Sequence, residues 1–414
     1  MGRGRSLLQT WMLSTAVAVA FIFLVWLSPG ARGETSTPKV DVNQQGEPYA
    51  AGELIVTYES DVSGQHVDKV VHEAKARVGE EIPIPDVQLL SFPGVKHEHS
   101  EKVREEKLRH AKETLEQDPA VKYVDYNYLR RPDYVPDDPE FVGGLQWNLY
   151  DIKAPAAWNT TLGNGVKVAV VDTGIAAHHP DLESKIAAQK DLVNNDNVAQ
   201  DDTEGHGTHV AGTVGAATNN GEGVAAVCPT CRLLVAKSGD SRGLFDTDIV
   251  QGIYWSVQNH AKAINLSVGS KVYSRILEHA VNYAWDHGVV VVAAAGNENT
   301  SKPHYPSAFK HVISVAATNQ LNKKAYFSNY GKIDVAAPGV EILSTVPGGG
   351  YDYKQGTSMA SPHVAALAGL LAAQGRSAPE IRRRIQKTAT DLGAEGKDKY
   401  YGWGLINANR AVSR

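Results

Sequence analysis

Cysteine is scarce in this chain: 414 residues contain two, Cys228 and Cys231. A single pair cannot build a zinc site without histidine partners. The C-x-x-C spacing leaves two readings open, a local disulfide in an exported protein or two free thiols at a turn. We favour the disulfide, with a structural rather than a redox role.

An excess of positive charge is also lacking. The net charge is −5 and the isoelectric point is about 6.3, so the composition offers no basic surface for nucleic acid. The hydrophobic fraction of 42% and the charged fraction of 21% are typical of a globular protein. The length allows two domains, or one large domain with a processing segment.

A long hydrophobic run occurs at the N-terminus, in residues 11–27. Arg3 and Arg5 precede it, and residues 31–33 (Ala-Arg-Gly) form a small-x-small cleavage site. This pattern predicts a signal peptide over residues 1–33 and a secreted protein with no stable membrane association after cleavage. The alternative is a retained membrane anchor, because the run approaches the length of a bilayer span.

The next segment, residues 34–133, begins with a polar linker and then changes character. Two strands and two charged amphipathic helices are predicted, over residues 53–58, 63–78, 101–115 and 121–127. They predict a small α+β module. Residues 128–137, with two arginines and two prolines, are typical of an exposed, cleavable junction. An ordinary N-terminal domain unrelated to activity is the alternative.

From about residue 134 the pattern alternates between strand, glycine turn and helix. Continuous apolar runs predict buried parallel strands at residues 167–171, 233–236, 263–266, 289–294 and 312–316. Helical patterns lie between them, at residues 206–217, 246–259 and 274–287. This alternation predicts an α/β sandwich around a mostly parallel sheet, with sites where strands end.

Three polar side chains follow such ends. Asp172 follows a strand, His206 opens a helix, and Ser358 opens another helix in the stretch Gly-Thr-Ser-Met-Ala-Ser-Pro, with Pro362 expected in its first turn. A serine hydroxyl needs a base to become a nucleophile, and a carboxylate orients that base. Alone, the serine would equally fit a helix N-cap; together the three predict a nucleophilic triad.

Asn297 follows a further strand and can supply an amide donor. With the backbone N–H of Ser358, it would stabilise the negative oxygen of a tetrahedral intermediate. His206 and His209 could be mistaken for a metal-binding pair. A zincin needs H-E-x-x-H, and glycine follows His206, so we expect His209 to be structural.

Four motifs in this order, D-T-G, H-G-T-H-V-A-G, A-A-G-N and G-T-S-M-A-S-P-H-V-A, resemble those of the subtilisin-like serine proteases. The resemblance covers about residues 134–414 and looks closest to the thermitase-type, calcium-stabilised secreted enzymes. It implies a three-layer subtilisin-like catalytic domain and a serine endopeptidase acting on polypeptides. It assigns the roles of orienting acid, general base, nucleophile and oxyanion donor to Asp172, His206, Ser358 and Asn297. More loosely, residues 34–133 resemble the family's inhibitory, self-processed propeptide.

The resemblance also implies substrate-binding residues. The pocket for the residue before the scissile bond would have two walls, one formed by Ser267, Val268 and Gly269 and the other by Ala294, Ala295 and Gly296. Arg242 and Gly243 would form a strand that flanks the substrate, and Glu298 and His304 would tune the pocket. We expect this pocket to accept large apolar or aromatic groups. For His304, a solvent-exposed loop residue is the alternative.

The resemblance also implies structural Ca²⁺ as the cofactor, a hard cation that takes six to eight oxygen ligands. The first site would use Asp138, Asp181, the Asn220 side chain and the carbonyls of Ala217, Glu222 and Val224. The second would use Asp191, Asn194, Asp196, Gln200 and the carbonyl of Val198. The alternatives are an Asn-Gly turn without an ion and a plain solvated loop.

Two other classes of function remain to be weighed. A non-catalytic peptide-binding protein that kept the fold would have lost a triad residue or the oxyanion asparagine, and none is missing. A metallohydrolase would use His206 and His209. We expect a monomer with its own propeptide as inhibitor.

Overall fold

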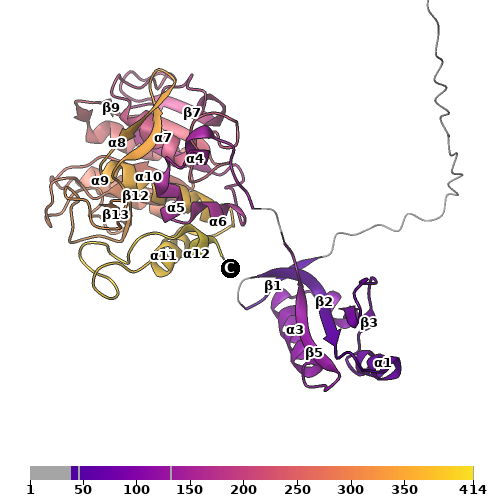
Figure 1. Cartoon of the computed structure of the whole chain (residues 1–414). Coiled ribbons are helices and arrows are strands. Elements are labelled where there is room, and N and C mark those ends of the chain that lie inside the picture. Colours follow the sequence, from indigo (N-terminus) through magenta and orange to yellow (C-terminus); the bar gives the residue numbers. More distant parts are fainter. Residues whose placement is uncertain (1–38, 45–46, 131–132, 414) are drawn as a thin grey trace, which may run out of the picture. The chain divides into compact units, whose positions relative to one another are not determined.

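The computed structural model describes residues 39–44, 47–130 and 133–413. The predicted signal peptide therefore lies outside the described residues. The chain forms two compact units, the smaller ending at Tyr128 and the larger running from Leu129 onward (Figure 1). No helix in the described part is long and apolar enough to cross a bilayer.

The smaller unit is an antiparallel sheet with helices. Its strands are β1 (Val40–Val42), β2 (Pro48–Tyr58), β3 (Arg77–Val78), β4 (Val87–Ser91) and β5 (Val121–Tyr128), and its helices are α1 (Gly64–Glu73), α2 (Pro93–Lys96) and α3 (Glu101–Leu115). Strand β2 pairs with β1, β4 and β5. The α+β prediction thus holds, but the sheet has more strands than the two predicted. The first helix ends at Glu73, because Lys75 turns left-handed (φ 54°) before β3.

A buried ion pair joins α3 to β1 in this smaller unit. The Arg104 guanidinium, on α3, binds the Asp41 carboxylate of β1 through two hydrogen bonds, and both side chains are almost fully buried. Arg104 Nη1 also donates to the carbonyls of Glu98 and His99. Charges buried this far from water need such complete pairing.

The larger unit is built on a seven-stranded sheet with the order β14-β13-β12-β11-β6-β8-β7. These strands are β6 (Lys167–Asp172), β7 (Ile186–Asp191), β8 (Arg232–Lys237), β11 (Ala263–Leu266), β12 (Val290–Ala294), β13 (Val312–Thr318) and β14 (Val335–Pro338). All six neighbouring pairs are parallel. The mostly parallel sheet is therefore confirmed.

Helices cover both faces of this sheet. They are α4 (Pro139–Val142), α5 (Trp147–Asp151), α6 (Ala154–Trp158), α7 (His206–Gly215), α8 (Asp246–Gln258), α9 (Arg275–Asp286), α10 (Thr357–Ala372), α11 (Ala378–Thr388) and α12 (Ala408–Val412). Two hairpins, β9 (Gly239–Asp240) with β10 (Gly243–Leu244) and β15 (Ile342–Val346) with β16 (Gly350–Lys354), complete it.

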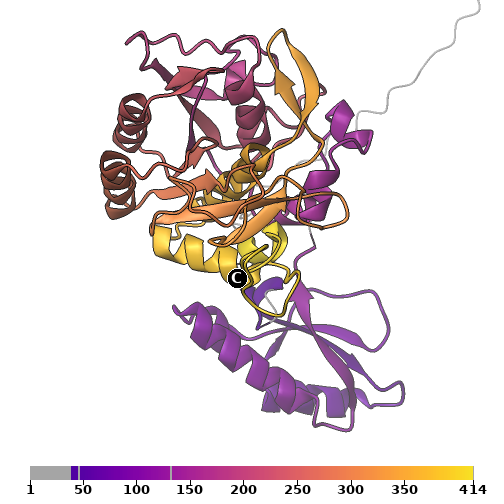
Figure 2. The same cartoon turned by 90° about the vertical axis from the view of Figure 1, so that its left-hand side faces the viewer.

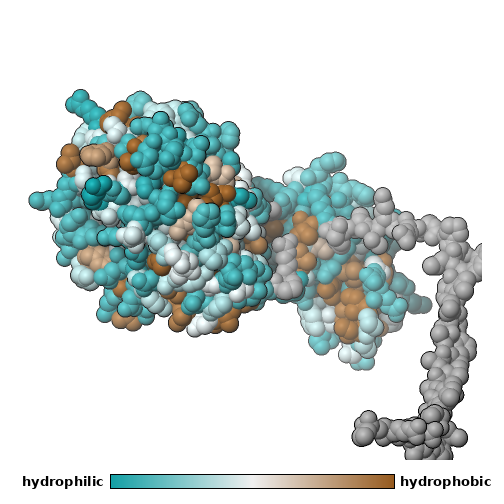
Figure 3. All heavy atoms as spheres, turned by 90° about the horizontal axis from the view of Figure 1, so that it is seen from above, coloured by the Kyte–Doolittle hydropathy of each residue, from teal (hydrophilic) through white to brown (hydrophobic). Residues whose placement is uncertain are grey.

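Alternation along the central strand produces two hydrophobic cores. Val168 and Val170 of β6 belong to the core shared with α7 and α10, whereas Ala169 and Val171 belong to the core shared with α8 and α9. Helices α8 and α9 pack side by side on their face (Figures 1 and 2). The result is the predicted three-layer arrangement. On the face drawn in Figure 3, the larger unit is mostly hydrophilic, with hydrophobic side chains scattered among polar ones.

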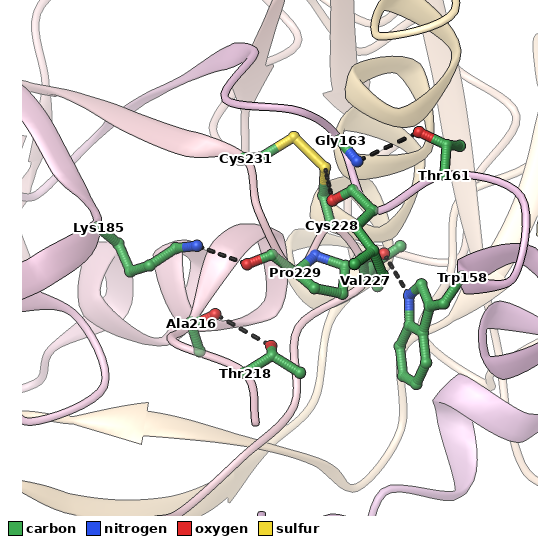
Figure 4. Close-up of a disulfide and its surroundings, with 11 residues drawn as sticks. Trp158, Thr161, Gly163, Lys185, Ala216, Thr218, Val227, Cys228, Pro229 and Cys231 are labelled. Carbon is green, nitrogen blue, oxygen red and sulfur yellow. Dashed lines mark hydrogen bonds between the residues drawn. A yellow bond between two sulfur atoms is a disulfide. The ribbon is translucent and has the colours of Figure 1, made fainter. Parts of the chain in front are cut away.

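Cys228 and Cys231 form a disulfide with both residues fully buried, in agreement with the reading we favoured. A Cβ on Gly163 or Gly369 would meet these sulfurs, so the bridge packs directly against the Ser358 helix α10 and the chain before β6. Beside it, Lys185 Nζ donates to the Pro229 carbonyl at 2.5 Å (Figure 4).

Candidate active site

The sheet order reverses around β6, which lies between β8 and β11. Sites in open parallel sheets form at such a point, beyond the carboxyl ends of the strands. Asp172 is the last residue of β6 and is 1% exposed. His206 is the first residue of α7. Its Nδ1 lies 2.7 Å from Asp172 Oδ1, so the structure brings the predicted acid and imidazole together.

The negative charge of Asp172 raises the pKa of His206. Burial by itself would lower the pKa of His206, but the adjoining Asp172 carboxylate, with a smaller contribution from Asp201, outweighs it and the pKa is raised. A carboxylate on Nδ1 also favours the tautomer that leaves Nε2 free to accept a proton. This pair is therefore suited to general base chemistry.

Ser358 lies in the first turn of α10, which begins at Thr357. Gly356 precedes the helix with a φ of 151°, a region that favours glycine. The expectation that Pro362 occupies the first helical turn is wrong, because it is the sixth residue of α10. Its position has a consequence: a proline has no N–H for the carbonyl four residues earlier, which is that of Ser358.

Ser267, just beyond β11, donates to the carbonyl that the proline leaves free. Ser267 Oγ donates to the Ser358 carbonyl at 2.8 Å, and Ser358 Oγ donates to the Ser267 carbonyl at 3.1 Å. The series of hydrogen bonds continues inward, because Asn265 Nδ2 donates to Ser267 Oγ and Ser361 Oγ donates to Asn265 Oδ1. Among the residues described, no hydrogen bond joins Ser358 Oγ to His206.

Asn297 follows β12 at the same edge of the sheet. Its Oδ1 accepts hydrogen bonds from Thr357 N and Thr357 Oγ1, both at 2.9 Å. The acceptor end of the amide is thus engaged, and its nitrogen is available as a donor. Thr357, which directly precedes Ser358, therefore orients Asn297. The sequence analysis missed this role, although the position of Thr357 within the serine motif could have indicated it.

A cavity of about 410 Å³ adjoins Ser358 and Asn297. Most of the predicted substrate-binding residues line it: Gly243, Ser267, Val268, Gly269, Ala294, Gly296, Glu298 and His304. Leu244, Ile249, Leu277 and Tyr305 also line it and were not predicted. Two predicted residues do not: Ala295 packs in a separate small core, and Arg242 extends into solvent and pairs with Asp240.

His304 closes one end of this cavity. It is 8% exposed, which excludes the alternative of a solvent-exposed loop residue. A Cβ added to Gly269 or to Gly296 would collide with its ring, so the two glycine walls converge on the imidazole. Its Nε2 lies 4.0 Å from Glu298 Oε1. Burial lowers the pKa of His304, against a smaller opposing effect of Glu298.

Asn329 was also missed, and it holds the Glu298 wall in place. Its Nδ2 donates to Glu298 Oε2 at 2.7 Å and to the Ala295 carbonyl, and its Oδ1 accepts from Glu298 N. Asn329 lies far along the chain from the recognised motifs, so no local signal pointed to it.

His209 is fully buried, and its Nε2 lies near the carbonyls of Ile342 and Asp352. Burial lowers its pKa to about 3. Within the described ranges, no group of three or more His, Cys, Asp or Glu side chains could hold a metal ion. The Nε2 of His209 is thus engaged by the protein's own backbone, which fits the structural role expected of this residue.

The residues of the first predicted calcium site do converge. Asp138 and Asp181 are both 0% exposed. Asp138 accepts from Asn219 N, and Asp181 accepts from Asn220 Nδ2 and Val224 N. Burial raises the pKa of both carboxyls. Asp181 also has a side-chain hydrogen bond with Tyr351. Two buried acids beside a loop rich in carbonyls fit a hard cation.

The residues of the second predicted site lie on one loop closed by a bridge between Asp191 and Asp196. Asp191 accepts from the backbone of the loop and from Asn194 Nδ2, and Asp196 accepts from Val198 N. Lys237 Nζ donates to the Gln200 carbonyl at 2.5 Å. These oxygens already have hydrogen-bond partners, and the partner of the Gln200 carbonyl is the Lys237 ammonium.

The chain is similar to known proteins over most of its length. A model of the subtilase family matches residues 163–404, and a model of the fervidolysin N-terminal prodomain matches residues 35–127. The chain is 38% identical to a thermophilic serine proteinase of Bacillus sp. (strain AK1) over 97% of its own length and 98% of that protein. It is 45% identical to thermitase of Thermoactinomyces vulgaris over 67% of its length and 99% of that protein.

Among solved structures, a protease from Pseudoalteromonas arctica PAMC 21717 superposes with a TM-score of 0.63 at 34% identity. The match covers 67% of this chain and 99% of that one. The chain therefore belongs to the subtilase family and is a subtilisin-like serine endopeptidase made with an N-terminal prodomain.

Proposed function

We propose that this protein is a secreted, calcium-stabilised endopeptidase that attacks peptide bonds with Ser358. His206 removes the hydroxyl proton as the oxygen attacks, Asp172 stabilises the imidazolium, and Asn297 with the N–H of Ser358 binds the oxyanion. The single observation that carries this proposal is the 2.7 Å contact between His206 Nδ1 and Asp172 Oδ1. His206 then gives that proton to the leaving amine as the peptide bond breaks, and water activated by the neutral His206 hydrolyses the acyl-enzyme.

The Ser358 hydroxyl requires one movement in this mechanism. It donates to the Ser267 carbonyl in the structure, and rotation about Cα–Cβ would turn it toward the imidazole. Hydrogen bonds of catalytic groups often tighten only when substrate is bound. The surrounding backbone, held by Ser267 and Pro362, would stay in place.

We further propose that the cavity holds the side chain before the scissile bond. The apolar side chains of Leu244, Ile249, Leu277 and Tyr305 in its lining, and its closed end at His304, favour a large apolar or aromatic group. Residues 267–269 and 243 would pair with the substrate backbone as added strands. Arg242, exposed beyond the cavity, would contact substrate only outside this pocket.

We propose one structural Ca²⁺ at Asp138, Asp181, Asn220 and the carbonyls of Ala217, Glu222 and Val224. The ion would offset the repulsion of two buried carboxylates and fix the loop after α7. The loop at Asp191 has less support, because the Lys237 ammonium already binds the Gln200 carbonyl there. Calorimetric titration tests this: one ion per chain fits the proposal, and a second would implicate the 191–200 loop.

The proposed processing scheme divides the chain into a signal peptide (residues 1–33), a propeptide (34–133) and the mature enzyme (134–414), with cleavage between Leu129 and Pro136. N-terminal sequencing of secreted wild type and of a Ser358→Ala variant tests self-processing. The wild type should begin near residue 134 and the variant should retain the propeptide. Equal processing of both would contradict the scheme.

A further inference from the structure

A second buried carboxylate, Asp201, lies beside the Asp172–His206 pair. Asp201 is 7% exposed and is five residues before His206. Its Oδ1 accepts from Thr173 Oγ1 at 2.6 Å and from Asp202 N at 2.9 Å. Its Oδ2 accepts from Thr208 N at 2.7 Å and from Thr208 Oγ1 at 2.5 Å. Four donors and no donated bond are the pattern of an ionised carboxylate.

The partners of Asp201 are the neighbours of the two catalytic groups. Thr173 follows Asp172 directly, and Thr208 is two residues after His206. Thr173 Oγ1 also accepts from Gly207 N at 2.9 Å, and Thr208 Oγ1 accepts from Ala176 N at 2.9 Å. Each hydroxyl therefore joins the segment that follows β6 to the start of α7, and Asp201 joins the two hydroxyls.

The start of α7 needs such support. Its N-cap is Gly205, in the left-handed conformation (φ 62°) and without a side chain that could cap the helix. The N–H groups of Gly207 and Thr208 are among those that a helix leaves unsatisfied at its N-terminus. Thr173 and Asp201 accept from them instead. His206 is the first residue of the helix that these bonds hold.

We propose that Asp201 is a positioning residue for catalysis: through Thr173 and Thr208 it fixes the register between Asp172 and His206. This inference rests on the proposed triad mechanism. A loosened register would leave substrate binding intact but would misplace the imidazole, and misplacement of about 1 Å can reduce turnover roughly 100-fold.

The test compares Asp201→Asn with Asp202→Asn. Asp202, the next residue, bonds to the N–H groups of Glu204, Gly205 and Ser241. Its substitution removes the same charge from the same loop but touches neither threonine. Asp201→Asn should lower kcat roughly 10- to 100-fold and leave KM within about twofold. Asp202→Asn should leave kcat within about twofold and act, if at all, on KM through the 239–244 hairpin.

A spectroscopic reading separates positioning from a general structural role. The proton between His206 Nδ1 and Asp172 should give a downfield ¹H NMR resonance, which Asp201→Asn should shift or broaden and Asp202→Asn should leave unchanged. The spectra are recorded in the Ser358→Ala background. The spectra therefore test the role of Asp201 without requiring activity. Failure of the proposed function would be seen separately, as wild-type activity that persists in Ser358→Ala.

The proposal is overturned if Asp201→Asn keeps wild-type kcat and the unshifted resonance, or if both asparagine variants lower kcat alike. Should Asp201→Asn not fold, Thr173→Val and Thr208→Val each remove one of its bonds. Both should lower kcat and shift the resonance, and two folded variants with wild-type kcat and resonance would equally overturn it.

Discussion

The carbonyl of Ser358 accepts a hydrogen bond from Ser267 Oγ at 2.8 Å, and the Ser358 hydroxyl returns one to the Ser267 carbonyl. The relationship exists because Pro362, four residues after Ser358, has no N–H to offer that carbonyl. The start of the nucleophile helix is thereby tied to the end of β11.

Ser267→Ala should therefore lower kcat roughly fivefold, the scale of one neutral hydrogen bond of about 1 kcal/mol. Pro362→Ala introduces an N–H that competes for the same carbonyl and should also lower kcat. The two effects should not add, because both act on one bond. Steady-state kinetics of the two single variants and the double variant measure this, and strictly additive losses would refute the linkage.

His304→Gly should change the cleavage-site profile. The imidazole separates the main cavity from a second one of about 130 Å³, since it lines both. Removing it joins them, so kcat/KM for the largest aromatic residues should rise relative to alanine by roughly tenfold or more. A peptide library digest reads the profile, with His178→Gly, at an exposed histidine remote from the cavity, as the control. An unchanged profile would remove His304 from the account.

Calcium chelation should lower the thermal midpoint of the protein, measured in the Ser358→Ala background to prevent autolysis. At a hundredfold excess of ion over Kd, binding stabilises by about 2.7 kcal/mol, which corresponds to roughly 5 °C. Asp138→Asn should abolish the difference between calcium and chelator. Its control is Asp286→Asn, at an exposed aspartate at the end of α9, which should keep that difference. A midpoint indifferent to chelator in the parent protein would contradict the calcium site.

Lys185 should make the larger unit more stable at alkaline pH. Its ammonium is buried, and burial together with the nearby Arg232 lowers its pKa to about 8. Because the unfolded chain binds this proton more tightly, stability rises as the pH increases from about 8 to about 10.5. Below pH 8 both states are protonated and the full penalty applies; above 10.5 both are neutral and the penalty vanishes.

Lys185→Met should consequently raise the free energy of unfolding below pH 8 by up to about 3 kcal/mol, because burial of the ammonium, which lowers its pKa to about 8, is no longer required. The gain should disappear near pH 10.5. Chemical denaturation of the Ser358→Ala protein across this range measures it. Lys310→Met, at an exposed lysine, serves as control, and a gain that did not depend on pH would show that burial of the charge is not its cause.

The central strands and helices of the larger unit were predictable because their residues face cores on both sides. Ala263–Leu266 and Val312–Thr318 are mostly apolar, and the predicted ranges agree within two residues. Strand β7 was missed because it lies at the sheet edge and most of its residues are only partly buried. Strand β14 is too short for its four residues to show a pattern.

The site shows a similar division. Asp172, His206, Ser358 and Asn297 each terminate or open an element, so local motifs located them. The contribution of Asn329 to the Glu298 wall and of Asp201 to the triad depends on tertiary contacts between loops, which no local periodicity encodes. The position of the His304 ring between Gly269 and Gly296 likewise depends on tertiary contacts and could not be predicted from the sequence.

The most direct test of the account is covalent labelling by phenylmethylsulfonyl fluoride, read by mass spectrometry of the digested protein. A catalytic centre formed by Asp172, His206 and Ser358 predicts one adduct per chain, on the peptide that contains Ser358. Labelling should be slowed by several orders of magnitude in His206→Ala and absent in Ser358→Ala. An adduct on another residue, or labelling that proceeds at the wild-type rate without His206, would contradict it.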